Sequence, residues 1–164
     1  MDANNMVNDK RSKKIALVAY CILNQNSRVL GLAERPSAIT EIVEFLVRMD
    51  VGIIQMACPE LTYAGILRKS QTKDEYDNVM FKDHCRKIAE EIARQIQEYA
   101  KCEIKLKIVI GVDGSPSCGV TDSGILIEEL RSILKEKEIT VPFHGIRYNR
   151  LSEDLKELEK LIKD

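Results

Sequence analysis

The sequence lacks an excess of charge of either sign, a long apolar run and an apolar leader. Its 164 residues carry 25 Lys and Arg against 26 Asp and Glu, and this balance disfavours bulk binding to nucleic-acid backbones. No run approaches the roughly 20 apolar residues that cross a bilayer, so we expect no membrane span. The polar tail 1–13 has no apolar signal core, which predicts a cytoplasmic protein. No repeat or linker divides the remainder, and residues 14–164 are expected to form a single domain.

Paired cysteines are also missing. The chain has 5 cysteines, an odd number at wide spacings, which disfavours the disulfide framework of a small secreted protein. We therefore expect the thiols to be reduced. No C-x-x-C pair occurs, although structural zinc sites usually contain one, so a zinc site is conceivable but has no motif to support it.

Strands and helices are predicted to alternate. Four buried strands are predicted from apolar, β-branched runs at 15–20, 51–56, 107–112 and 139–143. Helices are predicted from apolar residues at three- and four-residue spacing near 39–46, 81–100, 125–137 and 152–163. The alternation predicts an α/β fold, a three-layer Rossmann-like domain in which a mainly parallel sheet of about four strands is flanked by helices. Residues 61–78 show no clean period, and we expect a long loop or short helix that caps the site.

Three of the cysteines, Cys21, Cys58 and Cys118, each follow the end of a predicted strand. Because the carboxyl ends of parallel strands lie at one edge of a sheet, thiols far apart in sequence can meet there. Converging thiolates select zinc, copper(I) or an iron–sulfur cluster. A 4Fe-4S cluster with only three cysteine ligands leaves one iron open as a Lewis acid, and this is the arrangement we expect.

The other candidate ligands are less favourable. Cys85 and Cys102 lie in or just after the predicted helix 81–100, where a cysteine usually packs or lies at the surface, so we exclude both. His84 lies at the start of that helix, away from the strand ends. His144 follows the fourth predicted strand and is retained as a possible extra ligand.

The residues around these cysteines resemble a known family. The first strand ends at Cys21, the second is followed by Cys58-Pro-Glu60, and the third by Ser115-Pro-Ser117-Cys118-Gly119. Together, over about 14–147, they resemble the thiouracil desulfurase family. The resemblance implies that the three cysteines bind a 4Fe-4S cluster whose open iron takes the sulfur of a thiocarbonyl substrate, a thiolated nucleobase or related small molecule.

The resemblance also implies roles for nearby side chains. Glu60 and Ser115 are expected to assist the attack of water, in a desulfuration without net redox change. Asn24 and Ser117, which lie on the two loops that face the predicted cleft, are expected to bind substrate. Simpler explanations exist, because Pro59-Glu60 also suits the first turn of a helix and Ser115 also suits the start of a turn. After Cys21 the chain has Asn24-Gln-Asn-Ser-Arg28 where the family has a Cys-Arg-Tyr-Asp-Gly-like segment, so it resembles a divergent, desulfidase-related branch.

Two other functions compete with desulfuration. A low-molecular-weight phosphatase places an arginine shortly after its cysteine, but Arg28 stands one residue too far from Cys21 and the intervening loop has no glycine. A non-enzymatic sensor or sulfur carrier, with an iron–sulfur cluster or a zinc ion in the same site, stays open. The oligomeric state is not indicated by the sequence.

Overall fold

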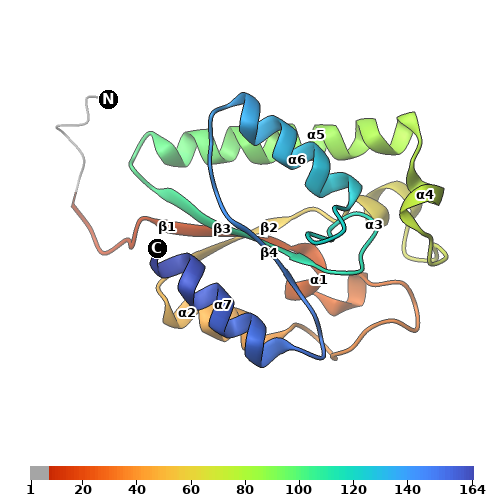
Figure 1. Ribbon diagram of the computed structural model, residues 1–164, viewed down its shortest axis with the longest axis horizontal. Coiled ribbons are helices and arrows are strands. Elements are labelled where there is room, and N and C mark those ends of the chain that lie inside the picture. Colours follow the sequence, from red (N-terminus) through yellow and green to blue (C-terminus); the bar gives the residue numbers. More distant parts are fainter. Residues whose placement is uncertain (1–7) are drawn as a thin grey trace.

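The fold has three layers, with a parallel sheet between two layers of helices (Figure 1). The computed structural model describes residues 8–164, so part of the predicted tail 1–13 lies outside the described residues. The strands are β1 (Lys14–Ala19), β2 (Gly52–Met56), β3 (Lys105–Val112) and β4 (Phe143–Ile146), in the order β2-β1-β3-β4. All neighbouring pairs are parallel, which confirms the predicted Rossmann-like α/β class.

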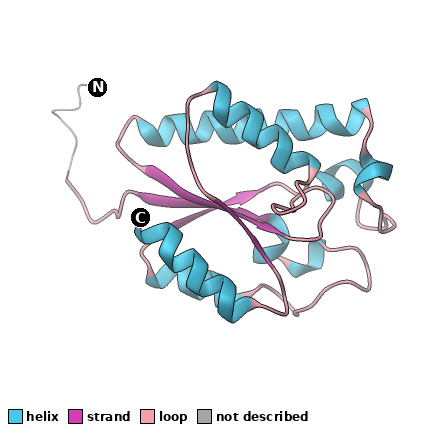
Figure 2. Ribbon diagram, in the orientation of Figure 1, coloured by secondary structure: helices cyan, strands magenta, loops and turns pink. Residues whose placement is uncertain are grey.

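The four longer helices cover the two faces of the sheet (Figure 2). Helices α5 (Val79–Ala100) and α6 (Ile125–Glu136) pack together on one face, and α2 (Thr40–Arg48) and α7 (Leu151–Lys163) lie on the other. Each is amphipathic and directs its apolar stripe at the sheet. Because both faces are covered, Ile15 to Ala19 of β1 are all buried, as a strand at the centre of a parallel sheet requires.

Shorter helices gather at the carboxyl end of the sheet. They are α1 (Tyr20–Leu23), the 3-10 helix η2 (Gln25–Ser27), α3 (Pro59–Ala64) and α4 (Lys73–Tyr76). The segment 61–78, predicted as a loop or short helix, therefore contains most of α3 and all of α4. The chain leaves β1 toward β2 on one side and reaches β3 on the other, so β1 and β3 flank the point where the strand order reverses. In open α/β sheets, ligands bind in the crevice outside this point.

The fourth strand does not lie where the sequence predicted it. The prediction of a strand at 139–143 is wrong, because β4 begins only at Phe143, which pairs with Val109. Pro142 has no N–H to give to a ladder and contributes only its carbonyl oxygen, which accepts from the Val109 N–H at 3.0 Å. The apolar residues Ile139 and Val141 instead pack against the core from the connection.

Within residues 8–164, none of the helices combines the length and apolar character that crossing a bilayer requires.

Candidate functional site

The register of the sheet brings Cys21 and Cys58 to the same level. Ala19 of β1 is paired with Met56 of β2, and each cysteine follows its strand residue by two positions. Cys21 lies in α1, while Cys58 is the N-cap of α3 and its sulfur accepts from the Leu61 N–H at 3.4 Å. The two thiols therefore lie at adjacent strand ends because of the pairing itself.

Cys118 reaches the same level by a loop that folds back onto β3. Its carbonyl oxygen accepts a hydrogen bond from the Val112 N–H at 3.0 Å. Gly111 makes this return possible, because a Cβ at that position would lie 2.1 Å from the Cys118 oxygen. Gly124 borders the loop on its other side, where a Cβ would lie 2.3 Å from the carbonyl carbon of Ser117. Because neither glycine has a side chain, the Cys118 loop can pack closely against both the sheet and the start of α6.

Asp113 organises the same loop. Its carboxylate accepts hydrogen bonds from the backbone N–H groups of Val120 and Thr121 and from the Thr121 hydroxyl, at 2.9, 3.0 and 2.6 Å. Arg147, just after β4, adds an ion pair at 3.6 Å. Burial acts to raise the pKa of Asp113, but these hydrogen bonds and the Arg147 charge outweigh it and hold the pKa below the ordinary value. The loop that carries Cys118 is therefore fixed by an ionised carboxylate.

The three thiols line one cavity of about 280 Å³, which we call the inner cavity. Glu60, Ser115 and Ser117 also line it. Among residues 8–164, no group of three or more His, Cys, Asp and Glu side chains is arranged to hold a single metal ion. The three cysteines, which follow three separate strands, nevertheless share one cavity.

As free groups, the three thiols are poor nucleophiles. Burial raises the pKa of Cys21 to about 11, with the Arg28 charge acting against the shift and the Cys58 charge adding to it. Burial also raises the pKa of Cys58, and it raises that of Cys118 well above the ordinary value. Because thiolates are the species that bind metals, ligation would release protons from these groups.

Glu60 lies in the first turn of α3, behind Pro59 at the first helical position, as its sequence context suggested. It is buried, and its Oε2 accepts from the Ser117 hydroxyl at 2.6 Å. The guanidinium of Arg68 lies 3.7 Å from its Oε1. The carboxylate therefore lies on the cavity wall in a fixed orientation.

The two serines of the loop have different partners. The Ser115 oxygen accepts from the Cys118 N–H at 3.0 Å and from the Ser117 N–H at 3.3 Å, so it closes the turn. Its hydroxyl also lies 3.3 Å from that of Ser117, and because Ser117 gives its proton to Glu60, Ser115 is the donor in this pair. Ser117 was predicted to bind substrate, but it is fully buried and directs its hydroxyl at Glu60. The Ser117 hydroxyl thus orients the Glu60 carboxylate.

Asn24, the other residue predicted to bind substrate, does not line the inner cavity. Its side-chain oxygen caps η2 by accepting from the Asn26 N–H at 3.1 Å. The neighbouring Gln25 is buried, and its side chain connects α1 to Tyr148. Its amide nitrogen donates to the Cys21 carbonyl at 2.7 Å and to the Tyr148 hydroxyl at 3.0 Å.

Two arginines border the inner cavity, and sequence reasoning gave neither a definite role. Arg68 holds the segment 61–78 over the site, because its guanidinium donates to the Ser27 carbonyl at 2.8 Å and to the Gly65 carbonyl at 3.1 Å. Arg28 lies over the ring of Tyr148, 4.9 Å from its centroid. Both arginines sit in segments without periodicity, so no local pattern marked them.

The remaining candidates lie elsewhere. The His144 imidazole lies 2.9 Å from the Asp154 carboxylate of α7 and does not line the cavity. His84 contacts the Thr62 hydroxyl at 2.7 Å. Cys85 is buried in α5, and neither it nor Cys102 lines the inner cavity.

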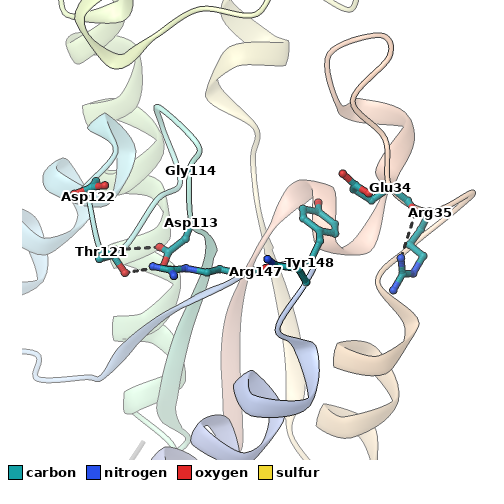
Figure 3. Close-up of a pocket in the computed structure, with 9 residues that line it drawn as sticks. Glu34, Arg35, Asp113, Gly114, Thr121, Asp122, Arg147 and Tyr148 are labelled. Carbon is teal, nitrogen blue, oxygen red and sulfur yellow. Dashed lines mark hydrogen bonds and ion pairs between the residues drawn. The ribbon is translucent and has the colours of Figure 1, made fainter.

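A larger hollow of about 610 Å³, the outer pocket, adjoins the inner cavity (Figure 3). The two share Glu34, Asp113, Gly114 and Tyr148 in their walls. Tyr148 lies between the loop that contains Asp113 and the segment that contains Glu34 (Figure 3). The outer pocket and the inner cavity thus lie on either side of the same four residues.

Comparison with known proteins identifies one clear relative. The chain is similar to the uncharacterized protein MJ0003 of Methanocaldococcus jannaschii, with 42% identity over 159 residues, 93% of this chain and 99% of that protein. No family model matches the chain. No solved structure matches it either. Because that relative is itself uncharacterized, the comparison shows that the two proteins are related but assigns no activity to this chain.

Proposed function

For a chain that belongs to the family of the archaeal protein MJ0003, we propose iron–sulfur-dependent hydrolytic desulfuration of a thiocarbonyl compound, such as a thiolated nucleobase. The observation that carries the proposal is that Cys21, Cys58 and Cys118, from three separate strand ends, line the same cavity. The motifs around them resemble those of the thiouracil desulfurase family, and this likeness supplies the reaction class.

The residues present fit a 4Fe-4S cluster with three cysteine ligands. No other thiol or imidazole lines the inner cavity, so the described residues offer three soft ligands and no fourth. When bound, the cluster supplies an open iron that acts as a Lewis acid toward sulfur.

The reaction is a substitution at carbon in which no electrons are transferred. A C–O bond forms from water, the C–S bond breaks, and the products are the carbonyl compound and hydrogen sulfide. Glu60 is the base that takes the proton from water, because its carboxylate is on the cavity wall and is oriented by Ser117 and Arg68. Ser115 also lines the cavity, and it assists by turning its hydroxyl away from Ser117 to donate a hydrogen bond to the substrate.

The test uses protein reconstituted with iron and sulfide without oxygen, and 2-thiouracil as the substrate. Uracil and sulfide should appear in equal amounts. Glu60→Gln should keep the cluster and lower the rate by about 10²–10⁴, the usual contribution of a general base. Glu90→Gln, an exposed carboxylate on α5, is the matched control and should leave the rate unchanged.

Four outcomes would contradict the proposal. Sulfide release without uracil would mean that the sulfur comes from the cluster. An undiminished rate in Glu60→Gln would show that Glu60 is not the base. Loss of iron in that variant would show that Glu60 is a ligand of the cluster. A stable cluster without turnover of any thiocarbonyl compound would favour the sensor or carrier.

A further inference from the structure

Among residues 8–164, Arg28 is a cation in the wall of the inner cavity that forms no ion pair with a carboxylate. The other three arginines around the two hollows each lie within 4.0 Å of a carboxylate: Arg35 at 3.2 Å, Arg68 at 3.7 Å and Arg147 at 3.6 Å. No such pair includes Arg28 among residues 8–164. Its Nη1 is buried and forms no hydrogen bond within the same part of the chain.

The Arg28 side chain is only partly exposed, and a cation that is partly withdrawn from water is stabilised by an anion beside it. The ring of Tyr148 lies 4.9 Å from the guanidinium carbon and stabilises one face of the cation. An aromatic ring does not replace a carboxylate, however, so the ring leaves the Arg28 Nη1 without a hydrogen bond. Since Arg28 lines the inner cavity, a negatively charged ligand in that cavity is the natural partner.

The supply of donors limits the kind of anion. A phosphate is usually held by several backbone N–H groups together with cationic side chains. In the Cys118 loop these N–H groups are already used, because those of Ser117 and Cys118 donate to Ser115, and those of Val120 and Thr121 donate to Asp113. The guanidinium of Arg28 would therefore meet an anion without help from these four N–H groups, a setting that suits a small monovalent anion better than a phosphate.

We infer that Arg28 binds negatively charged sulfur, either the thiolate form of the substrate or the hydrosulfide product. The guanidinium is weakly hydrated and lies against an aromatic ring, a setting that favours a polarisable anion. The identity of the anion rests on the proposed function, whereas the need for an anion rests on Arg28 alone.

The test uses the metal-free, reduced protein, so that its readout does not depend on the cluster. Calorimetric titration with sodium hydrosulfide, at a pH where the anion predominates, should show binding that Arg28→Met weakens by about tenfold or more. Arg28→Lys should retain part of it. Arg94→Met, a change of an exposed arginine on α5, should bind as the unchanged protein does. A second titration with 2-thiouracil, above and below its own ionisation, distinguishes substrate from product as the source of the charge.

Stability supplies an independent readout. Added sodium hydrosulfide should raise the urea midpoint of the unchanged protein and leave that of Arg28→Met unchanged, because a ligand stabilises only the folded state that binds it. An equal rise in both proteins would overturn the inference. Binding of neither hydrosulfide nor ionised thiouracil would overturn it as well, and so would equally tight binding of sulfate. If hydrosulfide binds through Arg28 but no thiocarbonyl compound is turned over, the anion site stands and the proposed function fails.

Discussion

The substitution Gly124→Ala tests how firmly the Cys118 loop is held. Gly124 has an ordinary φ of -68°, so alanine meets no conformational strain there. Its Cβ would lie 2.3 Å from the Ser117 carbonyl carbon, 2.5 Å from its oxygen and 2.8 Å from the Cys118 nitrogen. Since ordinary contacts begin near 3.4 Å, the loop must move by about an ångström. All three contacts are backbone atoms, which cannot rotate away.

We expect the added methyl to destabilise the fold by about 1–3 kcal/mol, as overpacking usually does. For a domain of this size this corresponds to a melting temperature lower by about 2–12 °C. Gly52→Ala is the matched control, because its Cβ would meet Ile15 at an ordinary 3.5 Å. Urea unfolding and thermal melting of the two variants give the comparison. Equal stability of the two would refute the close packing of the loop against the start of α6.

Three further variants test other contacts. Asp113→Asn should lose stability relative to the unchanged protein near neutral pH. Because the folded pKa of Asp113 is lowered, that difference should shrink as pH falls below about 3.8, and a constant difference would argue against an ionised carboxylate. Ser117→Ala should cost about 1.5–3 kcal/mol by leaving Glu60 without its donor, unlike Ser152→Ala on the exposed face of α7. Asp154→Ala should cost about 1–3 kcal/mol in thermal unfolding, because the carboxylate joins β4 to α7, and an unchanged melting temperature would contradict this.

The convergence of the cysteines could be predicted from the sequence because it depends on strand ends. The apolar runs before Cys21 and Cys58 mark the strands, and parallel pairing then places the residues that follow them side by side. The close packing of the Cys118 loop is also marked in the sequence by two glycines. Gly111 and Gly124 occupy positions where no Cβ fits.

Other parts of the site depend on contacts that no local pattern encodes. Tyr148 joins the site from beyond β4 and contacts Gln25 and Arg28, residues more than a hundred positions earlier. The different roles of Ser115 and Ser117 also follow from the fold of the loop, which buries one hydroxyl against Glu60. The fourth strand was misplaced because the apolar character of 139–143 reflects packing of a connection and Pro142 delays the pairing.

Iron and sulfide content, measured after reconstitution without oxygen, tests the central claim most directly. The protein and Cys102→Ala, a change of a thiol outside the cavity, should each take up one 4Fe-4S cluster per chain with a matching visible spectrum. Cys21→Ala, Cys58→Ala and Cys118→Ala should each lose the cluster. Full iron and sulfide in any of these three variants, or no uptake by the unchanged protein, would contradict a shared metal centre.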